Sequence, residues 1–460
     1  MRAERTPARL CSAIACAALL ASCGRSPGGS LSEASVLLVV ADALRADHLG
    51  CYGYDRPTSP FLDELAERAV LFESATGTAS HTVPSVLSLL TSARAARHGN
   101  LFFPKTQSFR APRRRVRPAV PEGLDTLAER FRRGGFRTGA VVSNPWLAAR
   151  YGFDRGFERY LHVAKKTADR DHVRGGEVNR SARELLEAWR GERFFLYVHY
   201  MDAHSPYDPP EPHRSRFLPA RGAYVYRNGP LPDLSEADLH FTRALYDAEI
   251  RSLDDHLRDL FSILDELSLG PRTLVVFTAD HGEEFHEHGG MGHGWTLYEE
   301  VLRTPLLFVH PALEAHARRI AAPVSALDVH PTVLDLVGES VPGEIDGISL
   351  APWILGPGEP PAERAVASEM GSLEALRRGR FKWLREPGAD ESAGVFDLVA
   401  DPGEQRPRTS AELGVDEPWS APVAPSRNVG IGTPLPAPAS AEEERLERQL
   451  EALGYVESTE

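Results

Sequence analysis

The chain has 460 residues, of which 42% are hydrophobic and 25% charged, and its formal net charge is −13. That length exceeds what one small core needs, so we expect one large domain with appendages. The acidic balance excludes nucleic-acid binding as the main function, and the hydrophobic content is ordinary for a soluble globular protein.

The N-terminus has the pattern of a bacterial lipoprotein signal peptide. Arg2, Arg5 and Arg9 precede an apolar run that is too short to span a bilayer but fits an export signal. Leu-Ala-Ser directly before Cys23 resembles the lipoprotein cleavage box, so we expect residues 1–22 to be removed and Cys23 to be lipidated. The alternative is a plain secretory signal. Lipidation predicts a protein of the cell envelope, anchored to a bacterial membrane with its main domain outside the cytoplasm.

The segment after the lipidation site is predicted to be a tether. Residues 23–34 are rich in Gly and Ser, which is typical of flexible linkers. Cys51 is then the one cysteine left for the folded part of the mature chain, so no intramolecular disulfide can form there. The main domain must therefore be stabilised by its hydrophobic core alone.

Apolar strand-like runs and helical patterns alternate over residues 35–360. This alternation predicts an α/β domain with a doubly wound sheet. We expect strands at 35–41, 138–144, 193–201, 273–279 and 304–311. Helices are expected at 61–70, 84–93, 123–133, 181–191 and 235–268.

The C-terminal part of the chain changes character. Residues 361–405 contain short strand-like pieces and are predicted to form a small sheet packed on the main domain. Residues 406–440 are rich in Pro, Ala and Ser and are predicted to be a linker. Helical spacing returns in residues 441–460, where we expect one terminal helix.

Two predicted strands end in residue types that can bind a metal. Asp42 follows the first predicted strand, and Asp280 and His281 follow another strand about 240 residues later. The carboxyl ends of parallel strands meet at one crevice, so these side chains are expected to converge. A single strand-end aspartate would more often cap a helix, but the combination predicts a divalent metal site. Carboxylate with imidazole suits zinc or manganese, whereas a set dominated by oxygen suits calcium.

A threonine lies at the start of the predicted helix near Pro84. The helix dipole and the unpaired backbone N–H groups at such a position favour an anion, either a nucleophilic alkoxide or a bound phosphate or sulfate. In isolation, Thr82 would more often be a helix N-cap.

Several segments together resemble the sulfatase family of the alkaline phosphatase superfamily. VLLVVADALRADHLG resembles its opening, HTVPSVLSLLTSARAARHG its nucleophile segment, and FTADHGEEFHEHGGMGHGWTLYEE its second metal segment. The resemblance extends in matching order over residues 35–405. It implies a central mixed, mostly parallel sheet sandwiched by helices, with a small C-terminal antiparallel sheet. It also implies a divalent metal and attack on a sulfur or phosphorus ester through a covalent intermediate.

The resemblance assigns roles to individual residues. Asp42, Asp280 and His281 fall on the family's metal ligands, and Thr82 falls on the nucleophile, which also binds the metal. One divalent metal, calcium, manganese or zinc, is therefore implied.

Other polar residues are assigned to the substrate. His204 falls on the substrate-binding or leaving-group histidine, and His293 falls where a Lys or His lies near the ester oxygens. Asp202 and Asn144 also end predicted strands and are weaker candidates for substrate binding. A second metal held by Asp202, His204 and His293 is a further option.

The departures from the family pattern narrow the chemistry. Sulfatases oxidise a Cys or Ser to formylglycine and carry an Arg four residues later, where this chain has Thr82 and Val86. Ala43 also replaces an acidic ligand of many sulfatases. Threonine at the nucleophile resembles phosphodiesterases, phosphonate hydrolases and phosphoethanolamine transferases of the superfamily. A phosphoester or phosphonate is therefore favoured over a sulfate ester.

Three functions follow from these residues. The first is a metal-dependent hydrolase of an anionic ester on a glycan, lipid or small molecule. The second is a transferase that moves a phospho-substituent between envelope components, with an alcohol in place of water. The third is a catalytically inactive binding lipoprotein, in which the losses at 43 and 86 mark a decayed site.

Overall fold

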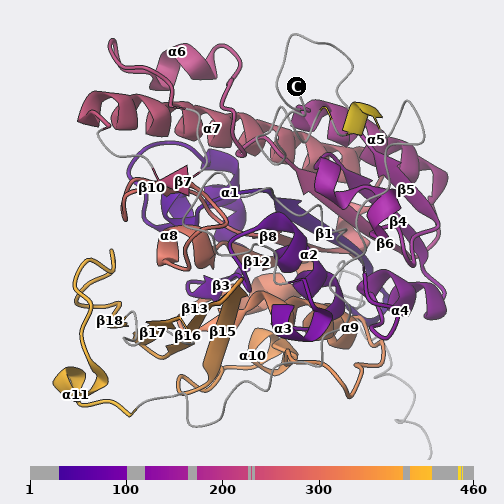
Figure 1. Cartoon of the computed structure of the whole chain (residues 1–460). Coiled ribbons are helices and arrows are strands. Elements are labelled where there is room, and N and C mark those ends of the chain that lie inside the picture. The colour runs from indigo at the N-terminus through magenta and orange to yellow at the C-terminus, as the bar shows by residue number, and fades with distance from the viewer. Residues whose placement is uncertain are drawn as a thin grey trace, which may run out of the picture.

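In the computed structural model, the residues described are 31–100, 120–163, 173–225, 229–230, 234–386, 394–416, 444–446 and 448. Within them the central sheet has eight strands in the order β13-β2-β12-β8-β1-β6-β4-β5 (Figure 1). The strands are β1 (Ser35–Ala41), β2 (Val70–Phe72), β4 (Arg137–Val142), β5 (Arg159–His162), β6 (Phe194–Tyr200), β8 (Thr273–Ala279), β12 (Leu306–Val309) and β13 (Arg318–Ile320).

The sheet is mixed and mostly parallel, as predicted. β1 pairs in parallel with β6 and β8, and β4 pairs in parallel with β5 and β6. β12 runs antiparallel to both β8 and β2, while β13 is parallel to β2. β12 is therefore the one strand of this sheet that opposes the others. β2, β5 and β13 are too short or too exposed to give a clear apolar run, so the sequence analysis did not find them.

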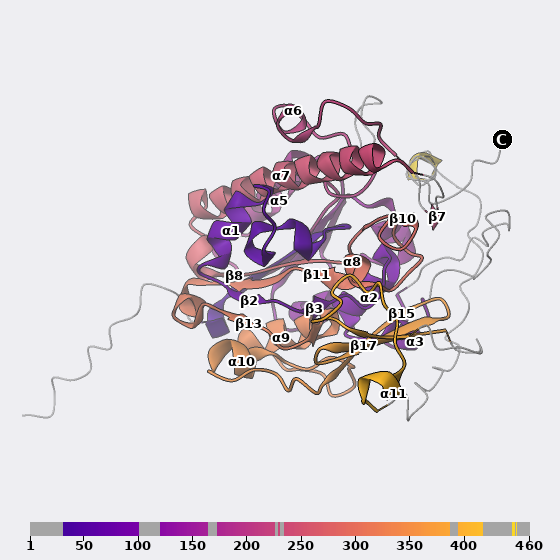
Figure 2. The ribbon, with the colours of Figure 1, turned by 90° about the vertical axis from the view of Figure 1, so that its left-hand side faces the viewer.

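Helices cover both faces of the sheet (Figures 1 and 2). In β1, Val36, Leu38 and Val40 pack into one hydrophobic cluster, and the alternate residues pack into the other. The first cluster includes residues of α2 (Thr82–Thr91), α4 (Leu127–Arg133), α9 (Val329–Leu336) and α10 (Ala351–Leu355). The second includes α1 (Pro60–Ala66), α5 (Gly175–Ala188) and α7 (Glu236–Glu266). This two-sided burial explains why β1 reads as an uninterrupted apolar run.

Helix starts follow local capping rules. Ser235 precedes the long helix α7, and its side chain accepts a hydrogen bond from the Asp238 N–H. Thr126 and Glu129 form a reciprocal capping box at the start of α4. The shorter helices are α3 (Ala95–His98), α6 (His213–Phe217), α8 (Glu299–Leu302) and α11 (Ser410–Leu413).

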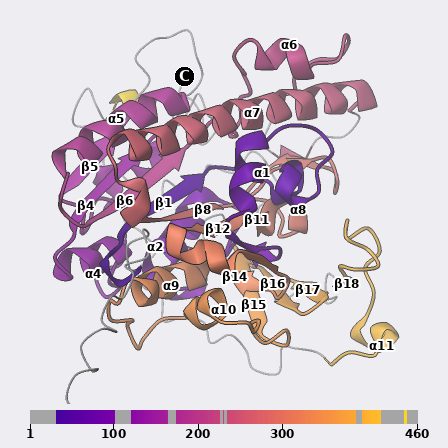
Figure 3. The ribbon, with the colours of Figure 1, turned by 180° about the vertical axis from the view of Figure 1, so that it is seen from behind.

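A four-stranded antiparallel sheet packs on the main domain, as predicted (Figure 3). Its strands are β15 (Ala365–Met370), β16 (Leu373–Arg378), β17 (Phe381–Arg385) and β18 (Gly394–Asp397). Lys382 of β17 is buried, and its ammonium lies 3.1 Å from Glu299 and 2.9 Å from Glu404. Lys382 and Glu404 are buried, so the ammonium needs at least one of these carboxylates as a partner. This triad therefore joins the small sheet to the start of α8.

Three-residue and two-residue strands form two further small sheets. One has the order β7-β10-β9 and the other β11-β3-β14. The strands are β3 (Ala75–Thr76), β7 (Gly229–Pro230), β9 (Glu284–Phe285), β10 (Gly290–Gly292), β11 (Arg303–Thr304) and β14 (Val324–Ser325).

Some predicted segments lie outside the described residues. These are the signal peptide at 1–22, most of the tether at 23–34, and most of both the linker at 406–440 and the terminal helix at 441–460. Among the residues that the structure does describe, no helix has the length and apolar character needed to cross a membrane.

Candidate active site and metal centre

The candidate site lies at the carboxyl ends of three adjacent strands. β8, β1 and β6 are neighbours, and Ala41 at the end of β1 is in register with Ala279 and Tyr200. Asp42 and Asp280 each follow directly after their strand, so strand pairing brings them together although they are distant in sequence. A hydrogen bond also links the two loops, since the backbone N–H of Ala43 donates to the side-chain Oδ1 of Asp280 at 3.2 Å.

The four residues predicted to hold the metal are brought together and are all buried. His281 Nε2 lies 3.5 Å from Asp42 Oδ1 and 3.7 Å from Asp280 Oδ2. Thr82, the first residue of α2, has its Oγ1 3.4 Å from the same nitrogen. The nucleophile candidate and the metal ligand candidates therefore share one site.

The polar atoms of this site have the arrangement that a divalent cation needs. Asp42 Oδ1 and Asp280 Oδ2 are buried and have no hydrogen-bond partner among the described residues. His281 Nδ1 lies 2.9 Å from the Gly282 carbonyl, so the proton belongs on Nδ1 and Nε2 presents its lone pair. Buried carboxylate oxygens without partners are costly, and a cation would compensate them. The residues present fit a metal.

Electrostatics keep the carboxylate ionised. Burial opposes the charge of Asp280, but His281 and His199 outweigh it and hold the pKa of Asp280 well below its ordinary value. Burial also lowers the pKa of His281, yet Asp280 and Asp42 together reverse this and the net shift is upward.

Asn144 contributes to the site and caps a helical turn at once. Its Oδ1 accepts from the Trp146 N–H at 2.8 Å. Its Nδ2 donates to Asp42 Oδ2 at 2.6 Å and lies 3.4 Å from Thr82 Oγ1. The side chain therefore caps the turn, and its amide fixes the orientation of Asp42, a candidate metal ligand.

His199 is a further member of the site that the sequence analysis did not select. It lies within β6, and its Nε2 is 3.9 Å from Asp42 Oδ2 and 3.8 Å from Asp280 Oδ2. One ligand atom from each of these three buried residues lies within 4.8 Å of the others. The sequence signal was a single ionisable residue inside an otherwise apolar strand, in the segment FFLYVHY.

His293 lies beside the candidate metal ligand His281, and His204 lies beside His293. The ring centroid of His293 is 4.4 Å from that of His281 and 5.0 Å from that of His204. His293 Nδ1 lies 2.8 Å from Glu283 Oε1, and Glu283 Oε2 accepts from the Tyr207 hydroxyl at 3.0 Å. Burial, followed by repulsion from His281 and His204, lowers the pKa of His293 well below its ordinary value. Glu283 therefore orients a neutral imidazole toward the site.

Asp202 lies beside the start of α5 and contacts residues other than the candidate metal ligands. Its Oδ1 accepts from the Gly175 N–H at 3.1 Å, at the start of α5, and lies 3.5 Å from His256 Nε2. Among the described residues, no group of potential ligands contains Asp202 with His204 and His293. The structure thus places His204 beside His293, but among the described residues it groups Asp202 with neither of them as a potential ligand.

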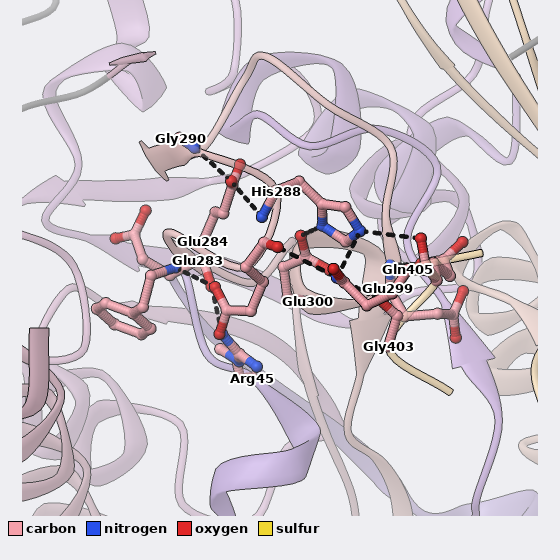
Figure 4. A network of polar contacts seen from close by, with 12 residues as sticks. Arg45, Glu283, Glu284, His288, Gly290, Glu299, Glu300, Gly403 and Gln405 are labelled. Atoms are coloured by element: carbon pink, nitrogen blue, oxygen red, sulfur yellow. Dashed lines mark hydrogen bonds and ion pairs between the residues drawn. The ribbon is translucent and has the colours of Figure 1, made fainter. Parts of the chain in front are cut away.

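A polar network supports the segment between Asp280 and His293 (Figure 4). Arg45 donates to the Glu283 carbonyl at 3.0 Å and to Glu287 Oε1 at 2.7 Å. His288 Nδ1 lies 2.6 Å from Glu300 Oε1, and Glu284 Oε1 accepts from the backbone N–H of His288. The contacts of Arg45 are long-range in sequence, and together with those of His288 they fix the loop that carries Glu283 and His293.

Comparisons with known proteins agree with this geometry. Residues 34–339 match the family model described as Sulfatase. Arylsulfatase K of Mus musculus is 30% identical over 189 residues, which cover 37% of this chain and 33% of the relative. Delta 4,5-hexuronate-2-O-sulfatase of Bacteroides thetaiotaomicron is 23% identical over 442 residues, covering 84% of this chain and 86% of the relative.

The matched part of the chain spans about a third of the length of the arylsulfatase K relatives, 33% and 34% for the mouse and Bos taurus proteins. Among solved structures, the phosphonate monoester hydrolase of Agrobacterium radiobacter has a TM-score of 0.67 at 22% identity. That similarity covers 83% of this chain and 92% of the hydrolase. Because the identity is 22%, this similarity supports the fold alone.

Proposed function

Because the chain belongs to the sulfatase family, we propose that it is a metal-dependent hydrolase of an anionic ester with Thr82 as its nucleophile. The observation that carries this proposal is the position of the Thr82 hydroxyl. It lies at the first residue of α2, 3.4 Å from His281 Nε2, beside two buried carboxylates. The helix N-terminus stabilises an anion at that position.

The metal would be held by Asp42, Asp280, His281 and the Thr82 oxygen. A divalent cation bound there lowers the pKa of the hydroxyl and stabilises charge on the ester oxygens. Asn144 holds Asp42 in place through the 2.6 Å hydrogen bond from its amide.

The proposed reaction has two steps. In the first, the Thr82 hydroxyl loses its proton to solvent, its oxygen forms a bond to phosphorus, and the bond from phosphorus to the leaving-group oxygen breaks. His204 supplies a proton to the leaving alkoxide, while the neutral imidazole of His293 holds the substrate's anionic group. In the second step, water cleaves the bond between Thr82 and phosphorus, which releases the acid and restores the hydroxyl.

The residues at 82 and 86 support a phosphoester or phosphonate as the substrate, in preference to a sulfate ester. Threonine cannot be converted to formylglycine, and Val86 cannot pair with an anion as an arginine would. Similar proteins include both ester classes, since an arylsulfatase and a phosphonate monoester hydrolase are among them.

A substrate panel tests this preference. We expect the purified protein to hydrolyse aryl phosphodiesters or phosphonates with a kcat/KM at least about tenfold above that for the matching aryl sulfate. The assay compares zinc, manganese and calcium with a chelator control. Faster turnover of the sulfate would refute the preference. Tight metal binding without turnover of any ester would refute the hydrolase and favour a transferase that lacks its acceptor.

We further propose that Cys23 is lipidated and anchors the protein to a bacterial envelope membrane. The support is the arginine-rich, apolar N-terminus that ends directly before Cys23. Cys23→Ala is expected to move the protein from the membrane pellet into the soluble fraction after cell breakage, because the acyl chains are lost. Cys51→Ala is the control and should stay in the pellet. Equal membrane association of wild type and Cys23→Ala would contradict lipid anchoring.

A further inference from the structure

His199 is a fully buried histidine whose ring makes no hydrogen bond within the part of the chain that the structure describes. It is in register with Val40 of β1 and Val142 of β4, within the central sheet. Neither Nδ1 nor Nε2 has a hydrogen-bond partner among the described residues. A buried polar ring without a partner is costly, so the ring requires a partner that belongs to the working protein.

The ring faces the same two carboxylates as His281. Its Nε2 lies 3.9 Å from Asp42 Oδ2 and 3.8 Å from Asp280 Oδ2. These distances are too long for hydrogen bonds. Two ligand atoms that share one ion at about 2.1 Å in tetrahedral geometry lie about 3.4 Å apart, so the observed separations are close to those of shared coordination.

We infer that His199 is an additional ligand of the metal, and that its imidazole makes this site selective for a zinc-like transition metal over calcium. The inference rests on the proposed function, which places a metal at Asp42 and Asp280. With His199 and His281 the donor set contains two imidazoles, two carboxylates and the Thr82 oxygen. Calcium takes six to eight oxygen ligands, whereas imidazole with carboxylate suits zinc.

Metal affinity, measured without turnover, tests this inference. The full-length chain is purified in detergent, stripped with chelator, and titrated with zinc or calcium in competition with an indicator. His199→Asn replaces the ring nitrogen by an amide oxygen. We expect its zinc affinity to fall by about a hundredfold or more while its calcium affinity does not fall, because only the nitrogen donor is lost.

The matched control is His330→Asn. His330 is also fully buried, its Nδ1 lies 2.9 Å from the Leu90 carbonyl, and its Nε2 has no partner among the described residues. The substitution His330→Asn therefore removes a comparable buried imidazole. We expect its affinities for zinc and for calcium to remain as in wild type. Thermal unfolding in chelator identifies any variant that does not fold.

A cobalt-loaded sample gives a second measurement. We expect the visible absorption of bound Co²⁺ to change in His199→Asn and not in His330→Asn, since it reports the ligands of the ion. Unchanged zinc affinity and an unchanged cobalt spectrum in His199→Asn would overturn the inference, as would tighter binding of calcium than of zinc by wild type. Tight zinc binding without ester turnover would instead refute the proposed function alone.

Discussion

Thr82→Ala is expected to lower kcat/KM for the best ester substrate by about a thousandfold or more, which corresponds to about 4 kcal/mol of transition-state stabilisation. The substitution removes the hydroxyl that attacks the ester. A water molecule that replaced it as nucleophile would not be held in position at the start of α2 as the Thr82 hydroxyl is. Initial rates at saturating metal measure the effect. Metal binding is recorded in parallel, because the Thr82 oxygen is also a proposed ligand.

Two variants separate catalysis from folding. Thr82→Ser keeps a hydroxyl and should retain a measurable part of the activity. Thr91→Ala removes a buried hydroxyl at the other end of α2, where it donates to the Leu87 carbonyl, and should leave kcat/KM within about threefold of wild type. A loss of less than about tenfold in Thr82→Ala would contradict a nucleophilic threonine.

Asp280→Asn is expected to abolish metal-dependent stabilisation together with activity. The amide oxygen can still accept from the Ala43 and His281 N–H groups, as Asp280 Oδ1 does now. The negative charge and the ligand atom Oδ2 are lost. Metal affinity should therefore fall by about a hundredfold or more, and the unfolding temperature should no longer rise when zinc or manganese is added.

The metal-free state gives the complementary result. Asp42 Oδ1 and Asp280 Oδ2 are buried without hydrogen-bond partners among the described residues. Although burial opposes its charge, His281 and His199 hold the pKa of Asp280 below its ordinary value, so its charge stabilises the metal-free fold. Asp280→Asn in chelator should therefore unfold at a lower temperature than wild type. Thermal scans with chelator and with metal measure both effects. If Asp280→Asn were still stabilised by the metal concentrations that stabilise wild type, the assignment of Asp280 as a ligand would be contradicted.

The sequence was most informative where local pattern and burial agree. β1 and β8 are apolar on both faces, so their positions and the residues that end them, Asp42 and Asp280, could be read directly. The long helix α7 was expected at residues 235–268 and extends over Glu236–Glu266. Capping residues and apolar periodicity explain both successes.

The residues that escaped prediction depend on tertiary neighbours. His199 has no sequence signal of its own beyond its polarity, and its meaning comes from strand pairing that places β6 next to β1. Glu283 received no role from the sequence, because its hydrogen bond to His293 depends on the fold of the 283–293 loop. Asp202 lies two residues beyond the end of β6, whereas Asp42 directly follows β1, and the carboxylate of Asp202 accepts from the Gly175 N–H at the start of α5.

The central claim is that Thr82 becomes covalently bonded to the substrate's acid group. The most direct measurement is peptide mass spectrometry of the protein quenched in acid during turnover of an aryl phosphodiester or phosphonate. We predict that the peptide containing Thr82 carries the phosphoryl or phosphonyl group, in the presence of metal and not with chelator. The claim would be contradicted if the enzyme were active but the modified peptide did not contain Thr82. It would also be contradicted if an active enzyme gave no modified peptide, either at steady state or in a single turnover.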